Sequence, residues 1–383
     1  MDTGTWEDAD LYDPDDPGAD ERKALLEYLT ARGATLEQLV EAHRLGSLPA
    51  VAGDLLRGTK PPSLSVEELA TRTGVPVERI LRVLLSAGLP VTSDSSLPED
   101  LSTLTSTFEQ AAIVMGEDAI LAFTRVLGGA ATTIAEAAVA LFYAELGPGA
   151  DREGSDELAR ARLSEAATLA FISVPGVLSR LLLIQFDRAS RRALPARGWS
   201  ALAGEVGSKA TPGHTEFVTL GFVDLVGSTQ WAEQLSLRDH SLALSRFESA
   251  AWSSAVQGGG RVIKMIGDEV FFTAPSVDAA CRIGIEICQA AASDPHLPPA
   301  RGAVGHGLVT PREGDYFGPL VNLVSRLVKV AAPDTLVVTE DAAGDLAADR
   351  WTLREPDQVE VPGLERPVRA FTVSGESLVQ LPD

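Results

Sequence analysis

Apolar residues recur every three or four positions through the first half of the chain, which is the spacing of helices that bury one face. Proline and glycine interrupt this pattern only at intervals, so the sequence predicts a helical domain over 21–192 behind a flexible acidic tail over 1–20. The longest apolar helices are expected over Thr107–Leu127, Thr132–Leu146 and Asp156–Leu183. Because none carries a paired-carboxylate, histidine-cluster or glycine-loop pattern, this half is expected to be structural or regulatory.

The second half alternates strands and helices. A segment rich in glycine and proline over 193–214 is interpreted as a linker, and the alternation then runs through 215–376. The expected elements are a strand at Glu216–Val226, a helix at Ser228–Val256, strands at Arg261–Ile266 and Glu269–Thr273, a helix at Val277–Ala292, a strand at Ala300–Val309, a helix at Pro319–Ala331 and a strand at Thr335–Thr339. The leading order βαββαβ predicts an α+β, ferredoxin-like sandwich with one sheet and helices on one face, preceded by an all-α domain.

One segment of the helical half, Ser65–Gly88, has helix-turn-helix spacing, with two expected helices joined at Gly74. Binding to DNA would require basic residues on the second helix. Three glutamates instead offset three arginines in this segment: Glu67, Glu68 and Glu78 against Arg72, Arg79 and Arg82. A plain helical hairpin is therefore favoured, and no nucleic-acid partner is expected.

The net charge narrows the possible partners. The chain has 54 acidic and 32 basic residues, a net charge of −22, which repels nucleic acids and anionic membranes. Its start is acidic, unlike a signal peptide. Two apolar runs, Gly128–Gly147 and Phe171–Phe186, are interrupted by polar residues or proline, so buried helices, no membrane span and a cytoplasmic location are expected. Cys281 and Cys288 lie two helical turns apart, about 10 Å, too far for a disulfide.

The candidate chemistry begins at Asp224, in the motif FVDLVGST at the end of the first expected strand. A carboxylate among apolar neighbours is costly to bury unless a cation pairs with it. Gly227, Ser228 and Thr229 follow and start a helix, whose free backbone N–H groups favour an anion such as phosphate. The combination indicates a metal-bound phosphate.

A second carboxylate, Asp268, occupies the tight turn in RVIKMIGDEVFF between two expected strands. If these strands neighbour the first one, Asp224 and Asp268 converge. Two carboxylates with phosphate oxygens are a usual setting for Mg²⁺. Either aspartate alone is explained by a turn or helix-capping role, whereas the two together, with the helix start between them, favour a metal site.

These motifs resemble those of class III adenylate and guanylate cyclases over roughly 215–374. The resemblance implies two Mg²⁺ or Mn²⁺ ions held by Asp224 and Asp268. It also implies a pair that selects the base and a pair that contacts the ribose and the triphosphate, here Lys264 with Asp315 and Asn322 with Arg326.

The chemistry of these residues fits an adenine substrate. Lys264 is able to donate to adenine N1 and Asp315 to accept from the exocyclic amine, whereas guanine is poorly matched. Asn322 and Arg326 are four residues apart on an expected helix, and the bidentate arginine fork suits charge developing on a phosphoryl group. The expected reaction is attack of the ribose 3′-oxygen of ATP on its α-phosphorus, giving cyclic AMP and pyrophosphate.

The spacing of Lys264 and Asp268 predicts how the site is assembled. Four residues in an extended strand span about 13 Å, so one nucleotide would struggle to use both from a single chain. The resemblance implies that the metal aspartates come from one subunit and the other four residues from its partner. We therefore expect a C₂ homodimer with two shared active sites.

The first half resembles, less specifically, the helical regulatory domain of two-domain actinobacterial cyclases, in LLEYLTARGATLEQLVEAHRLGSLP and the hairpin after it. The resemblance implies a signalling enzyme whose catalytic pair this domain restrains, with Ser179–Trp199 as the transmitter. The helices near Phe108–Leu146 either form a closed dimer core or enclose an apolar ligand such as a fatty acid. His214 is the histidine to test for a pH response.

Other functions remain open. A guanylate cyclase is disfavoured by Lys264 and Asp315, and a catalytically silent nucleotide-sensing module is disfavoured because all six site residues are present. The Gly-Gly-acidic-acidic-Phe hairpin of diguanylate cyclases is absent from the sequence. Many relatives carry a Lys-Gly pair where this chain has Pro362 and Gly363, so a contact of Arg366 or Arg369 with the triphosphate is left undecided.

Overall fold

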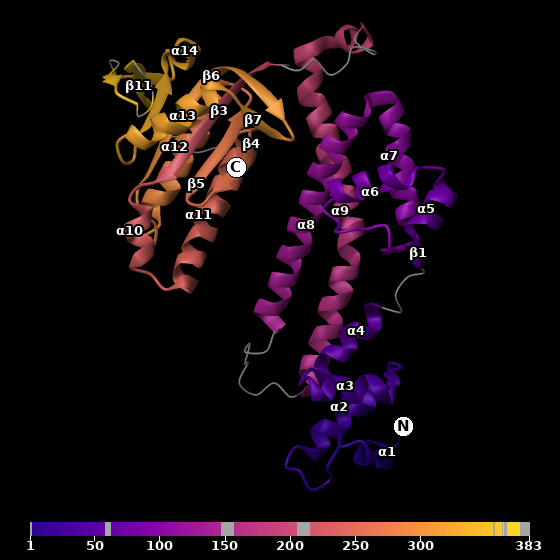
Figure 1. Ribbon diagram of the computed structural model, residues 1–383. Coiled ribbons are helices and arrows are strands. Elements are labelled where there is room, and N and C mark those ends of the chain that lie inside the picture. Colours follow the sequence, from indigo (N-terminus) through magenta and orange to yellow (C-terminus); the bar gives the residue numbers. More distant parts are fainter. Residues whose placement is uncertain are drawn as a thin grey trace. The chain divides into compact units, whose positions relative to one another are not determined.

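The computed structural model describes residues 2–57, 63–146, 157–204, 215–354, 357–361, 363 and 366–375. Contacts divide the chain into two compact units, Met1–Lys209 and Ala210–Asp383, which we call the N-terminal unit and the C-terminal unit (Figure 1). The division falls inside 193–214, the segment interpreted as a linker.

The N-terminal unit begins with a small helical cluster. Its helices are α1 (Thr3–Asp8), α2 (Ala19–Ala31), α3 (Leu36–Arg44), the short 3₁₀ helix η1 (Leu48–Ala50) and α4 (Val51–Arg57). The Asp2 carboxylate caps α1, and the Trp6 side chain, 2% exposed, packs into the apolar cluster formed by α2, α3 and α4. The expectation of a flexible tail over 1–20 is therefore wrong, because burial of one large aromatic side chain anchors the acidic segment.

The segment with helix-turn-helix spacing forms a helical hairpin. α5 (Val66–Thr73) ends at Gly74, whose φ of 71° gives the left-handed turn, and α6 (Val77–Ser86) follows. A two-stranded antiparallel ribbon of β1 (Ser63–Ser65) and β2 (Ser96–Pro98) flanks the hairpin. Apart from this ribbon, the described part of the unit is helical, as expected; strands of three residues are too short to show an alternating pattern in the sequence.

Three long helices complete the unit: α7 (Leu101–Met115), α8 (Glu117–Leu146) and α9 (Glu157–Gly204). The break between α7 and α8 lies at Gly116, which has a φ of 90°, and not between 127 and 132 as the pattern predicted. α9 continues through Pro195 to Gly204, so the first part of the expected linker is helical.

Much of α8 and α9 is exposed within the chain. The most apolar 18-residue windows within Glu117–Leu141 and Glu157–Arg192 are only 17% and 6% buried, so within one chain these helices are not buried, contrary to expectation. By length and composition both stretches could cross a membrane, which alone is weak evidence. The exposed apolar side chains include Phe123, Val139, Leu141, Ile172, Leu181, Leu182, Leu183, Ile184 and Phe186.

The C-terminal unit is built on one mixed sheet in the order β10-β11-β8-β6-β3-β5-β4 (Figure 1). Its strands are β3 (Glu216–Leu225), β4 (Arg261–Ile266), β5 (Glu269–Ala274), β6 (Ala300–Arg312), β7 (Asp315–Phe317), β8 (Leu336–Thr339), β9 (Trp351–Leu353), β10 (Asp357–Val359) and β11 (Val368–Gly375). Its helices are α10 (Ser228–Glu233), α11 (Leu237–Gln257), α12 (Val277–Ser293), α13 (Pro319–Val330) and α14 (Glu340–Gly344). The βαββαβ order and the ferredoxin-like fold are confirmed.

Two details of this unit differ from expectation. Helices cover both faces of the sheet: Val223 packs on the side of α11 and α12, whereas the adjacent residue Phe222 packs on the side of α13. Successive strand residues point to opposite faces, so an unbroken apolar strand buries both. The helix expected over 228–256 is divided, because the Ser236 side chain caps a new start at Leu237.

The two cysteines lie on α12 inside the core. Cys281 and Cys288 are both free and buried, as expected. Burial raises the pKa of each thiol to about 12, so neither is a reactive thiolate at neutral pH.

Candidate active site

Asp224 lies near the end of β3 with its side chain only 5% exposed. It is paired across the sheet with Glu269 of β5 on one side and with Arg301 of β6 on the other. The Leu225 N–H donates to the carbonyl oxygen of Asp268 at 3.4 Å. The turn that carries Asp268 therefore lies beside the end of β3, as the motif spacing predicted, and Gly267 supplies its left-handed φ of 64°.

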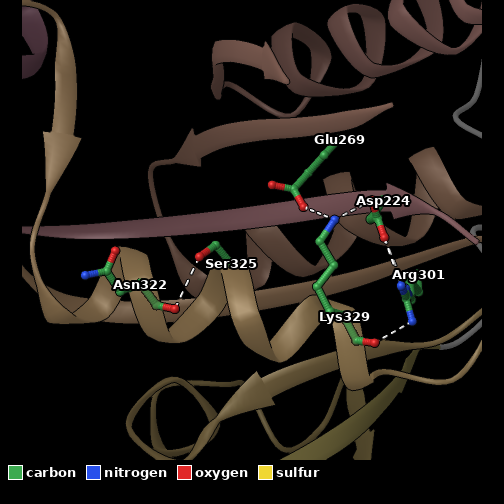
Figure 2. A network of polar contacts seen from close by, with 6 residues as sticks. All are labelled: Asp224, Glu269, Arg301, Asn322, Ser325 and Lys329. Atoms are coloured by element: carbon green, nitrogen blue, oxygen red, sulfur yellow. Dashed lines mark hydrogen bonds and ion pairs between the residues drawn. The ribbon is translucent and has the colours of Figure 1, made fainter. Parts of the chain in front are cut away.

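Figure 2 shows a polar network around Asp224. Arg301 donates to Oδ2 from Nη2 at 3.0 Å and from Nε at 3.3 Å, and Lys329 Nζ donates to Oδ1 at 2.7 Å. The same ammonium lies 2.6 Å from Oε2 of Glu269. The sequence analysis missed these three partners. In the sequence, the only indication of a role was closeness to a predicted site residue: Glu269 follows Asp268, and Lys329 lies three residues after Arg326.

The network places two carboxylates against two cations in a largely buried setting. Burial raises the pKa of Glu269, with further increases from the charges of Asp224 and Asp268, while the Lys329 ammonium opposes these effects. Burial lowers the pKa of Lys329, but its hydrogen bonds to Asp224 and Glu269 outweigh this and raise it. Lys329 is therefore a fixed positive charge at neutral pH.

A divalent cation fits the donors present here. The Asp224 carboxylate is at the end of β3, and Asp268 lies in the adjoining turn. Among the described residues, no group of three or more histidine, cysteine, aspartate or glutamate side chains forms a complete metal cage. A hard ion such as Mg²⁺ needs few protein carboxylates when phosphate oxygens and water complete its shell, so two carboxylates suffice as protein donors.

The expected base-selecting pair is brought together. Lys264 on β4 and Asp315 at the start of β7 are 51 positions apart, and the Lys264 ammonium donates to the Asp315 carboxylate. The hairpin of β6 and β7 achieves this, because Arg261 of β4 holds its tip through the Gly314 carbonyl at 3.5 Å and the Tyr316 hydroxyl at 3.4 Å.

Asn322 and Arg326 are exposed side chains of α13. Asn322 points away from Asp224 (Figure 2). The guanidinium of Arg326 lies against Gly363, where an added Cβ would stand 2.5 Å from Nη1. Gly363 has a φ of +81°, so this position both requires a glycine and leaves room for the arginine. Within one chain, therefore, Asn322 does not face the carboxylates.

The remaining predicted positions are also located. Gly227, with a φ of 70°, precedes the start of α10 at Ser228, and Thr229 is exposed in its first turn. Arg369 forms an ion pair with Glu340 of α14. His214 lies outside the described residues.

The comparisons with known proteins cover both halves of the chain. The family model of the adenylate cyclase regulatory domain matches residues 9–189. An uncharacterized protein of Mycobacterium tuberculosis strain H37Rv is 29% identical over 360 residues, 92% of this chain and 90% of that protein. A pH-sensitive adenylate cyclase of Mycobacterium tuberculosis strain CDC 1551 is 28% identical over 367 residues, 92% of this chain and 88% of that protein. An adenylate cyclase of Glutamicibacter nicotianae is 35% identical over 130 residues, 34% of this chain and 32% of that protein.

The ferredoxin-like sheet is the fold of a nucleotidyl cyclase domain, and it brings Asp224 at the end of β3 near the turn of Asp268, and Lys264 of β4 onto Asp315 of β7. A helical regulatory unit precedes it. Residues 9–189 thus match an adenylate cyclase regulatory domain, and the chain is similar over most of its length to an actinobacterial adenylate cyclase.

Proposed function

We propose that the protein is an adenylate cyclase that converts ATP to 3′,5′-cyclic AMP and pyrophosphate at sites shared by two copies of the chain. The observation that carries this proposal is the contact between Lys264 and Asp315, which brings together a donor and an acceptor from distant parts of the chain. A donor for adenine N1 beside an acceptor for its amine is complementary to adenine and not to guanine.

Asp224 and Asp268 would hold two Mg²⁺ or Mn²⁺ ions, which supply Lewis acidity toward the 3′-hydroxyl and the triphosphate. The chain's own side chains bind and orient the nucleotide. Lys264 and Asp315 fix the base, Asn322 the ribose, and Arg326 the charge developing on the transferred phosphoryl group. The backbone after Gly227, at the start of α10, provides N–H donors for phosphate oxygens.

The homodimer is supported by the direction of Asn322, which points away from the Asp224 of its own chain (Figure 2). A second copy would present its Asn322 and Arg326 to that carboxylate. The many exposed apolar side chains of α8 and α9 are a second support, because large exposed apolar groups are typical of an interaction site. The N-terminal unit would then control activity by setting how two catalytic units meet.

Identification of the product tests the activity. Pure protein would be incubated with ATP or GTP and Mn²⁺, and cyclic AMP from ATP is the expected product. Cyclic GMP would identify a guanylate cyclase, and nucleotide binding without any product a silent sensing module.

Complementation tests the shared site. Asp224→Ala and Lys264→Ala proteins should each be inactive, and mixing them should restore activity at one of the two sites. No recovery, in mixtures shown by light scattering to contain heterodimers, would contradict a site divided between chains.

Deletion of residues 1–200 tests the role of the N-terminal unit. Higher turnover of the truncated chain would identify autoinhibition, and lower turnover a role in dimerisation. Binding of a fatty acid near 108–146 stays a secondary proposal, and a thermal unfolding midpoint unchanged by long-chain fatty acids would contradict it.

A further inference from the structure

The Asp224 carboxylate is fully engaged by cations of its own chain. Arg301 takes Oδ2 with two N–H groups, and the Lys329 ammonium takes Oδ1 (Figure 2). A divalent cation that coordinates Asp224 directly needs at least one of these oxygens, because a carboxylate is the donor a hard ion prefers. Metal binding at Asp224 therefore competes with an existing contact.

The two cations differ in how firmly they are held. Arg301 is the cross-strand neighbour of Asp224 on β6, is 19% exposed, and also donates to the Lys329 carbonyl at 2.6 Å. The Lys329 side chain is 49% exposed and reaches Asp224 through a flexible stem from the last turn of α13. Displacement of Lys329 requires only a rotamer change, whereas displacement of Arg301 breaks a fixed fork.

We propose that Lys329 is an internal cation that competes with the divalent metal ion for Asp224 and so sets the metal concentration at which the site fills. The inference rests on the proposed metal role of Asp224. Together with Arg301, Lys329 offsets the charge of the Asp224 and Glu269 carboxylates in the metal-free protein, and the metal takes over the part of Lys329 when it binds. Lys329 is thus a positioning residue that acts through Asp224 and does not touch the nucleotide.

Lys329 also links the metal carboxylate to the helix that carries the proposed nucleotide contacts. Asn322 and Arg326 lie on the same helix, seven and three residues earlier. The contact of Lys329 with Asp224 and Glu269 therefore ties this helix to the ends of β3 and β5 in the metal-free state. Release of the contact leaves α13 freer to adjust toward the nucleotide of the partner's site.

The test uses Mn²⁺ alone as the probe and the full-length chain. Mn²⁺ affinity is measured by isothermal titration, and the thermal unfolding midpoint is measured in EDTA and in Mn²⁺. Lys329→Met removes the competing charge, so Mn²⁺ should bind roughly tenfold more tightly, the effect expected when a like charge a few ångströms away is removed at a partly exposed site. The unfolding midpoint should fall in EDTA, where Asp224 and Glu269 have lost their ammonium, and recover in Mn²⁺.

Lys329→Gln is the milder variant, because its amide keeps hydrogen bonds to the carboxylates without the charge. It should also bind Mn²⁺ more tightly than the wild type. Lys23→Met on α2 is the matched control, with the same loss of charge in the N-terminal unit, and should change neither measurement. Equal or weaker Mn²⁺ binding by both Lys329 variants would overturn the inference. So would variants that stay unfolded in saturating Mn²⁺, since the metal should replace the ammonium.

The double variant Asp224→Asn, Lys329→Met distinguishes the role of Lys329 as a competing cation from the role of Asp224 as a metal ligand. Loss of the tight Mn²⁺ binding is expected. If the binding persists, the ion is elsewhere and the metal role of Asp224 in the proposed function fails as well. If wild-type protein forms cyclic AMP but the Lys329 variants bind Mn²⁺ no more tightly, only the role of Lys329 is wrong.

Discussion

The two units of this chain bury their apolar side chains to very different extents. In the C-terminal unit, α12 buries nine of its 17 residues against the sheet. In the N-terminal unit, the most apolar 18-residue window of α9, within Glu157–Arg192, is only 6% buried. The catalytic fold is therefore complete within one chain as a packed core, whereas the long helices of the regulatory unit need something further to cover them.

The active site follows the same division. The carboxylate network around Asp224 is closed by residues of its own chain, from β5, β6 and α13. Asn322 on α13 is exposed and directed elsewhere. Local packing thus completes the ionic network around Asp224, whereas the proposed nucleotide contacts of Asn322 would require a second copy.

Truncation of a core side chain should produce the largest effect on stability. Phe271 is fully buried and stacks on Phe222 with ring centroids 4.4 Å apart. Phe271→Ala should lower the free energy of unfolding of the C-terminal unit by about 3–5 kcal/mol, as large-to-small core changes do. Phe186 on α9 is 70% exposed. The matched variant Phe186→Ala should change the free energy of unfolding of the N-terminal unit by less than about 0.5 kcal/mol in dilute monomer. Chemical denaturation would measure the free energy of unfolding of each variant. Equal losses in the two variants would show that the two units do not differ in how far these side chains contribute to stability.

Loss of the metal carboxylate should be next in size. Asp224→Asn keeps the shape of the side chain but removes the charge, so the rate of cyclic AMP formation should fall by about 100-fold or more, since metal Lewis acidity contributes several kcal/mol. The initial rate with ATP and Mn²⁺ is the measurement. Circular dichroism should show an intact fold, and unchanged turnover would show that Asp224 does not hold the metal.

A charge placed among the exposed apolar residues of α9 should weaken the proposed dimer. Leu183 is 68% exposed in the chain and should be covered in the dimer. Leu183→Glu should raise the dimer dissociation constant by about tenfold, because a charge would be buried without a partner. Sedimentation would measure this, and cyclic AMP formation should fall in parallel. Arg188→Glu, a charge change on a polar exposed position of the same helix, is the control. A monomeric wild type would contradict the prediction.

The smallest effect should come from the polar contacts that tie the start of α9 to α2. The Arg32 guanidinium, which donates to Glu165 at 2.8 Å, and the Tyr28 hydroxyl hold the pKa of Glu165 below its usual value of 4.5. A lowered folded-state pKa means that this stabilisation is present above pH 4.5 and is lost as the pH falls through the lower value. Glu165→Gln should therefore lower the unfolding midpoint slightly at neutral pH and flatten its acid dependence. A wild-type acid profile in this variant would rule out a role for Glu165.

The order of strands and helices in the C-terminal unit followed from the sequence, because hydrophobic periodicity and turn glycines act locally. β4 begins and ends as the pattern predicted, at Arg261 and Ile266. The motif residues Asp224 and Asp268 were likewise found from the sequence, since the strand, turn and helix start that carry them are short-range features. Their joint placement depended only on β3 and β5 being neighbours.

Only the tertiary structure decided which distant residues meet. Lys329 and Arg301 look like ordinary surface charges in the sequence, and nothing in their spacing places them on Asp224. The burial of Trp6, the helices on both faces of the sheet and the exposure of α9 were also beyond local patterns. The physical reason is common to all of these cases. Periodicity tells which face of an element is apolar, but what covers that face is determined by contacts between residues far apart in the chain, or on another chain.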